Sequence, residues 1–148
     1  DESVVSRMVK KGGEVLRSES LNVVGGDVDL CTYEGLSMAT ISYEAPHGRF
    51  NTHIDHCNGS YVFLASLGNT CNFMVHTPSM ASPRRFKLFS GDMLVFNPST
   101  EAAIKHGVES IDEAASSSGE SLGREFPALK NHRYGVQCRM HFSRGSLG

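Results

Sequence analysis

Two histidines and one aspartate in this chain offer metal-binding atoms at a suggestive spacing. His53 and Asp55 are separated only by Ile54, and His106 follows much later. If residues 52–56 form a strand, His53 and Asp55 point to one face and Ile54 to the other. Two imidazoles and one carboxylate are the facial triad of non-haem iron(II), which leaves coordination positions open. The residues therefore predict a catalytic iron site. The alternative is a polar loop whose side chains bond to solvent or backbone, because H-x-D is a short motif.

A second candidate feature is the alternating pattern at residues 133–142. One face would carry Arg133, Gly135, Gln137, Arg139 and His141, and the other Tyr134, Val136, Cys138, Met140 and Phe142. The second set is suited to a core, so the first set faces either solvent or an interior. Arginines facing an interior need anionic partners, because an unpaired buried charge is costly. A small dicarboxylate beside the metal would supply them, since arginine binds a carboxylate through two parallel hydrogen bonds.

Length and composition limit the kinds of protein that this chain can be. Its 148 residues are suited to a single domain, here residues 1–148. The net charge of -2 and pI near 6.4 argue against a generally basic, nucleic-acid-binding surface. The four cysteines lack C-x-x-C spacing, which favours a reducing, intracellular compartment over a disulfide framework or zinc ribbon. No apolar run approaches membrane-spanning length, so no membrane partner is expected.

The elements that must position these residues are mostly short strands. Apolar runs punctuated by turn residues predict strands at residues 38–44, 50–56, 61–67, 71–77, 85–89, 93–96, 104–109 and 133–142. Short strands without intervening amphipathic helices are typical of an antiparallel sandwich or barrel. Residues 1–37 form an N-terminal extension with a short helix at residues 4–9 and a Gly25-Gly26 hairpin turn. Residues 112–124, rich in alanine, serine and glycine, predict a flexible loop between the His106 and Arg133 strands.

The order of these motifs resembles the AlkB-like branch of the Fe(II)/2-oxoglutarate-dependent dioxygenases. The resemblance covers residues 38–142, most of the chain. Its most specific parts are H-x-D at residues 53–55, G-D-x-hydrophobic at 91–94 before H-G-V at 106–108, and R-Y at 133–134 followed by Arg139. It implies an all-β fold, a double-stranded β-helix or jelly roll, with its core at residues 38–142.

The resemblance also implies roles for individual residues. Iron(II) would be held by His53, Asp55 and His106. Arg133 would pair with the distal carboxylate of 2-oxoglutarate, and Arg139 would lie near the metal-chelating end of this co-substrate. Tyr43 resembles the tyrosine of an N-x-Y pattern that also contacts the distal carboxylate. Its alternative role is that of a strand aromatic packed in the core.

The activity implied is an oxidoreductase reaction that uses dioxygen and 2-oxoglutarate. In AlkB-like proteins it is commonly oxidative demethylation of N-alkylated bases in DNA or RNA, with release of succinate, carbon dioxide and formaldehyde. Three positions depart from the family pattern: Ile41 and Gly135 replace asparagines, and Cys57 replaces an acidic residue found in relatives that act on bases. The basic residues 83–87 could contact a phosphate backbone, or they form an exposed, solvated hairpin.

Two other functions stay open from the residues. One is a 2-oxoglutarate oxygenase that hydroxylates a protein or a small molecule. The other is a non-catalytic jelly roll that binds a metal or ligand. The sequence does not indicate an oligomeric state.

Overall fold

Two four-stranded antiparallel sheets make up the described part of the protein. A computed structural model describes residue 7, residues 33–113 and residues 123–142. The elements run β1 (Tyr33–Glu44), β2 (Phe50–His53), β3 (Ser60–Gly68), β4 (Cys71–His76), β5 (Arg84–Leu88), β6 (Met93–Phe96), β7 (Lys105–Ile111), the 3₁₀ helix η1 (Pro127–Leu129) and β8 (His132–Phe142). The strand order is β1-β8-β3-β6 in one sheet and β2-β7-β4-β5 in the other.

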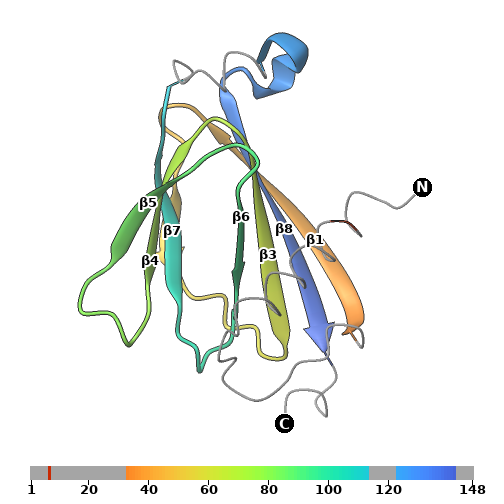
Figure 1. Cartoon of the computed structure of the whole chain (residues 1–148), viewed down its shortest axis with the longest axis vertical. Helices are drawn as coiled ribbons and strands as arrows, with labels where there is room; N and C mark the ends of the chain where they lie inside the picture. Colours follow the sequence, from red (N-terminus) through yellow and green to blue (C-terminus); the bar gives the residue numbers. More distant parts are fainter. Residues whose placement is uncertain (1–6, 8–32, 114–122, 143–148) are drawn as a thin grey trace.

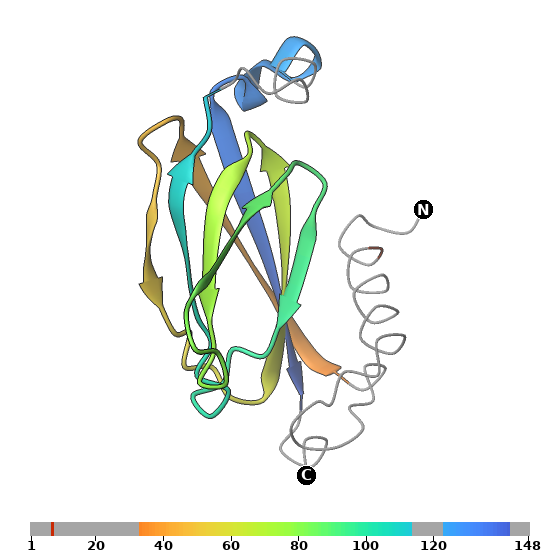
Figure 2. The ribbon, with the colours of Figure 1, turned by 60° about the vertical axis from the view of Figure 1, so that its left-hand side comes forward.

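The two sheets face each other as the layers of a jelly roll (Figures 1 and 2). Consecutive strands repeatedly switch sheets: β1 lies in one and β2 in the other, and β7 and β8 are divided in the same way. This crossing gives the double-stranded β-helix that the sequence predicts. The all-β fold class is therefore confirmed.

The core lies between the sheets and draws residues from both. Its buried members are Tyr43, Cys71, Phe73, Leu88, Val108 and Ile111, with Ile41, Ala45, Leu64 and Leu94 packed against them. The alternation predicted for β8 is also confirmed. Arg133, Gly135 and Gln137 line an interior cavity, whereas Cys138 and Met140 lie on the opposite face and are fully buried. Each face of this strand therefore carries fully buried residues, with partly buried ones between them.

One glycine fixes the passage from β3 into β4. Gly68 has a φ of +88°, which side-chain-bearing residues rarely adopt, and a Cβ there would lie 2.3 Å from the carbonyl oxygen of His132. The close approach is possible only for glycine. It lets β3 turn away beside the start of β8, which carries Arg133.

The predicted strands are all present: residues 93–96 match β6 at both ends, and no end of another strand shifts by more than five residues. The largest shift is at β1, which begins at Tyr33 instead of residue 38, and β2 ends at His53 instead of residue 56. Apart from residue 7, the predicted helix at residues 4–9 lies outside the described residues, as do the Gly25-Gly26 hairpin and most of the loop at 112–124. Among the described residues, no helix has the length and apolar character needed to cross a bilayer.

Candidate metal centre

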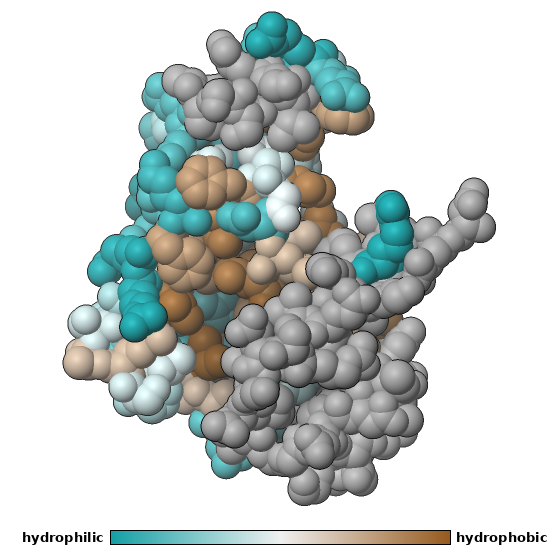
Figure 3. Space-filling view, in the orientation of Figure 1, coloured by the Kyte–Doolittle hydropathy of each residue, from teal (hydrophilic) through white to brown (hydrophobic). Residues whose placement is uncertain are grey.

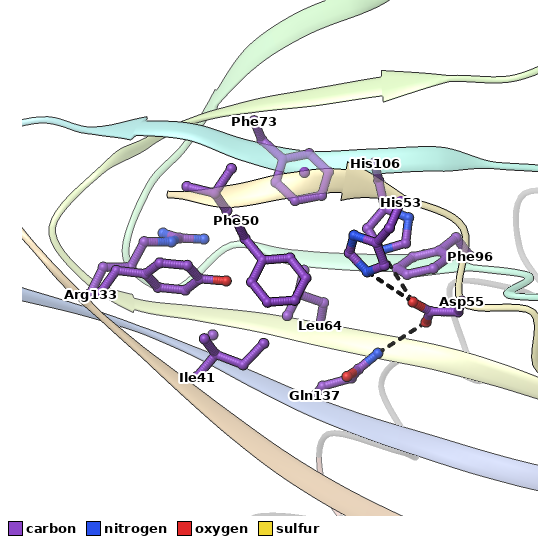
Figure 4. Close-up of a pocket in the computed structure, with 14 residues that line it drawn as sticks. Ile41, Phe50, His53, Asp55, Leu64, Phe73, Phe96, His106, Arg133 and Gln137 are labelled. Carbon is purple, nitrogen blue, oxygen red and sulfur yellow. Dashed lines mark hydrogen bonds and ion pairs between the residues drawn. The ribbon is translucent and has the colours of Figure 1, made fainter. Parts of the chain in front are cut away.

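Three side chains converge where the ends of β2 and β7 meet. His53, Asp55 and His106 each offer one ligand atom, and these atoms lie within 4.8 Å of one another. Asp55 Oδ1 is 3.1 Å from His53 Nε2 and 3.6 Å from His106 Nε2 (Figure 4). Two imidazole nitrogens thus face the same carboxylate oxygen. This is the trio expected from the sequence to hold iron.

The reason for this convergence differs from the expectation. A strand over residues 52–56 was expected to put His53 and Asp55 on one face, but β2 ends at His53 and Asp55 lies in the following loop. The strand cannot continue through His56, whose φ is +53°. His56 bonds through Nδ1 to Thr100 Oγ1 at 3.3 Å and lies outside the trio.

Gly107 allows the two histidine-bearing strands to approach each other. His53 and His106 are register partners on β2 and β7, and their rings are 4.4 Å apart. A Cβ on Gly107 would lie 2.7 Å from the Phe50 carbonyl oxygen and 3.1 Å from Thr52 backbone atoms. Any larger residue would push β2 away from β7. The close packing of β2 on β7 at this site therefore requires the glycine of H-G-V.

Backbone carbonyl groups hold both histidines in the tautomer that a metal needs. His53 Nδ1 lies 2.9 Å from the carbonyl oxygen of Asn51, and His106 Nδ1 lies 3.2 Å from that of Ile104. A carbonyl oxygen can only accept, so each Nδ1 carries the proton and donates it. In the neutral rings, each Nε2 then has a lone pair facing Asp55. Neutral imidazole with its other nitrogen bonded to a carbonyl is the usual arrangement of a metal-binding histidine.

This donor set passes a simple chemical test for a cation. Two lone pairs and a carboxylate oxygen that converge without a proton or cation repel one another. Burial lowers the pKa of His106 below its ordinary value, although its backbone hydrogen bond and Asp55 act in the opposite direction. The buried ring therefore favours the neutral state. A divalent cation among Nε2, Nε2 and Oδ1 satisfies all three donors, so the residues fit iron(II).

The second oxygen of Asp55 is held by β8. Arg139 Nη2 donates to Asp55 Oδ2 at 2.7 Å, and Gln137 Nε2 donates to the same oxygen at 3.3 Å. The carboxylate side chain is only 7% exposed. Gln137 was not singled out from the sequence. Its place on the Arg133 face, two residues before Arg139, was the available signal.

A cavity of about 220 Å³ extends from the metal-binding trio between the sheets. Its middle is apolar and is lined by Ile41, Phe50, Leu64, Phe73, Phe96 and Val108 (Figure 4). Polar groups lie in two places, with the trio and Gln137 at one and Tyr43 and Arg133 at the other. A short chain with apolar methylene groups between two polar ends matches this division.

Arg133 is buried at the end of the cavity away from the trio. It is 1% exposed, and its Nη1 donates to Ser66 Oγ and to the carbonyl oxygens of Asn69 and Leu88. None of these partners is an anion. Its Nε has no hydrogen-bond partner among the described residues. Burial lowers the guanidinium pKa, although the charge of Asp92 acts in the opposite direction. Because arginine stays protonated, the site holds a buried cation that forms no ion pair with another described residue.

Tyr43 and Arg139, the other residues assigned to the co-substrate, lie in different surroundings. Tyr43 is the register partner of Arg133, lines the cavity and is 7% exposed within the core cluster. Its packing in the core is therefore observed, and its contact with the distal carboxylate of a co-substrate stays a prediction. Arg139 does not line the cavity and instead pairs with Asp55. Its contact with a co-substrate stays a prediction.

The other candidates lie away from the trio. Cys57 accepts a hydrogen bond from Ser60 Oγ at 3.4 Å, and His141 Nε2 lies 3.0 Å from Ser37 Oγ. On β5, Arg85 pairs with Glu109 at 2.9 Å and Lys87 with Asp112 at 2.7 Å. The basic segment is therefore largely neutralised. Figure 3 shows the polar left-hand edge formed where β5 and β4 lie in Figure 1.

Comparisons with known proteins support the fold. A scan of protein-family models and a search of curated proteins both return no match. The solved structure of OsALKBH1 is similar over 95% of this chain and 63% of that one, with 20% identity and a TM-score of 0.57. The chain thus spans less than two thirds of that structure. This likeness establishes a shared double-stranded β-helix.

Two further structures have lower TM-scores. The Drosophila melanogaster CENP-C cupin domain aligns over 93% of this chain and 96% of its own, at 10% identity and a TM-score of 0.47. An uncharacterized conserved protein with a double-stranded beta-helix domain from Klebsiella pneumoniae aligns over 85% of this chain and 76% of its own, at 10% identity and 0.44.

Proposed function

We propose that this protein is an iron(II)- and 2-oxoglutarate-dependent dioxygenase. The observation that carries the proposal is one cavity with two complementary ends. One end has two imidazoles and a carboxylate whose ligand atoms lie within 4.8 Å. The other has a buried arginine whose Nε has no hydrogen-bond partner and which forms no ion pair with any residue that the structure describes. A 2-oxo dicarboxylate has a metal-chelating group at one end and a carboxylate at the other, so it complements both.

Each residue has a defined task in this proposal. His53, Asp55 and His106 hold the iron and leave part of its coordination sphere open. Arg133 binds the distal carboxylate of 2-oxoglutarate through its free Nε edge, with the Tyr43 hydroxyl beside it. The apolar wall of Phe50, Leu64, Phe73 and their neighbours packs on the methylene groups and excludes water. When bound, iron(II) would activate dioxygen, 2-oxoglutarate would supply two of the four electrons that dioxygen takes up, and the substrate would supply the other two.

We further propose N-alkylated bases of DNA or RNA as the substrate, with release of succinate, carbon dioxide and formaldehyde. The support is the order of AlkB-like motifs over residues 38–142 and the fold shared with OsALKBH1. The charge on β5 adds no support, because Arg85 and Lys87 are paired with acidic residues. Substrate recognition would therefore depend on groups nearer the cavity.

A substrate panel tests this assignment. The protein is incubated with iron(II), 2-oxoglutarate and oxygen together with methylated single-stranded DNA, methylated RNA or methylated peptides. Succinate and formaldehyde are both quantified. We expect both products to increase together with one of the nucleic acids. Products formed only with peptides would exclude base demethylation but keep the dioxygenase. Metal binding without succinate in any mixture would instead indicate a non-catalytic module.

A further inference from the structure

Asp55 lies in a loop, so β2 does not fix the direction of its carboxylate. β2 ends two residues earlier, at His53. A carboxylate with free rotation presents either oxygen, or both, to a metal. Within the described part of the chain, both hydrogen-bond donors to its Oδ2 belong to β8, a strand of the opposite sheet. The orientation of this ligand is therefore set across the gap between the sheets.

We infer that Gln137 is a positioning residue that directs Asp55 Oδ1 to the metal, an inference that rests on the proposed iron site. Gln137 Nε2 and Arg139 Nη2 both donate to Oδ2, at 3.3 and 2.7 Å. One donor leaves the carboxylate free to swing about that hydrogen bond. Two donors from different directions fix its plane, with Oδ1 turned toward both Nε2 atoms (Figure 4).

The neutrality of the glutamine is part of its task. Arg139 already brings one positive charge to Oδ2. A second cation would reduce the negative charge that attracts the metal, whereas an amide supplies direction without charge. Gln137 also lines the cavity, which places its amide between the ligand set and the apolar wall. Partners of this kind typically change metal affinity when they are removed.

The test is a cobalt(II) titration without 2-oxoglutarate. Calorimetry measures the dissociation constant, and visible absorption records the ligand-field spectrum. Gln137→Met keeps the length of the side chain and removes its donor. We expect the dissociation constant for cobalt to rise about 10- to 100-fold, with a changed ligand-field spectrum. Gln137→Asn keeps the amide but shortens it by one methylene, so it should weaken binding similarly and serves if the Met variant folds poorly.

Val136→Thr is the matched control, because this neighbour on β8 does not line the cavity. It should leave cobalt binding unchanged. Gln137 variants that bind cobalt within twofold of the parent protein, with its spectrum, would overturn the inference. If they lose only 2-oxoglutarate affinity, Gln137 contacts the co-substrate and the inference is also wrong. Failure of the parent protein to bind cobalt would instead contradict the iron site itself.

Discussion

At the scale of single residues, the candidate site depends on which atoms are already engaged. Each histidine donates a hydrogen bond from Nδ1 to the carbonyl oxygen two residues earlier, which leaves the lone pair of Nε2 for a metal. Asp55 Oδ2 accepts hydrogen bonds from β8, and its Oδ1 faces the two histidines, where a metal would bind. Arg133 uses Nη1 on neutral partners and keeps Nε free. The two Nε2 atoms and Asp55 Oδ1 are therefore available to a metal, and Arg133 Nε is available to a carboxylate.

Arg133→Ala should sharply weaken 2-oxoglutarate binding. Removing the buried cation leaves the distal carboxylate without a charge partner, a loss of about 2 to 5 kcal/mol. Calorimetry with the manganese(II)-loaded protein would measure this change. Arg85→Ala is the matched control, since Arg85 is exposed and paired with Glu109. Equal 2-oxoglutarate affinity in the Arg133 variant, with folding verified by circular dichroism, would exclude this residue from the binding site.

The described cysteines should differ in reactivity. Burial raises the pKa of Cys71 to about 11, so its unreactive thiol form persists in the folded state as the pH rises past the ordinary value of 9.0. Its contribution to stability should be fully present below pH 9 and decrease between there and about pH 11. At pH 8, iodoacetamide should modify the half-buried Cys57 before Cys71 or Cys138. Peptide mass spectrometry measures the order of modification. Modification of Cys71 or Cys138 before Cys57 would contradict the prediction.

At the scale of elements, the pairing of β2 with β7 brings the two histidines together. The sequence was sufficient to predict that these strands exist, because the apolar runs and turn residues that mark them are local signals. It could not predict where β2 ends, since the left-handed His56 and the loop at Asp55 depend on contacts with β8 and the Thr100 turn. Asp55 therefore lies beside His53 as predicted, but hydrogen bonds from β8 place it there instead of the alternation of a strand.

Gly107→Ala should separate β2 from β7 and weaken both metal binding and folding. The added methyl would lie 2.7 Å from the Phe50 carbonyl oxygen. Relieving such a contact should cost about 1 to 3 kcal/mol of unfolding free energy. Urea unfolding and cobalt titration would measure the two effects. Gly35→Ala on β1, where nothing lies within 4 Å, is the control. If the Gly107 and Gly35 variants behave alike, the β2–β7 approach does not limit the site.

At the scale of the whole molecule, the cavity joins the two sheets. It takes Tyr43, Leu64 and Arg133 from one sheet and His53, Phe73 and His106 from the other. The sequence predicted the jelly roll and the face of β8 that lines this space. It did not indicate Ser66, Asn69 or Leu88 as partners of Arg133, because these contacts bring together positions 45 to 67 residues apart.

Ligands that bind between the sheets should stabilise the fold as a unit. At a free 2-oxoglutarate concentration about 100 times its dissociation constant, the manganese(II)-loaded protein should gain about 2.7 kcal/mol. Thermal unfolding without oxygen would show this gain as a higher midpoint. The His53→Ala variant should gain much less, because it loses a metal ligand. Equal stabilisation of both proteins would place the ligand elsewhere.

The most direct test of the central claim is the conversion of 2-oxoglutarate to succinate. The purified protein is loaded with iron(II) and 2-oxoglutarate without oxygen, air is admitted, and succinate is quantified by mass spectrometry. We predict succinate that requires iron(II) and the protein and that His53→Ala abolishes. Succinate formation that continues unchanged in His53→Ala, or its absence from the iron-loaded parent protein even across the substrate panel, would contradict the assignment.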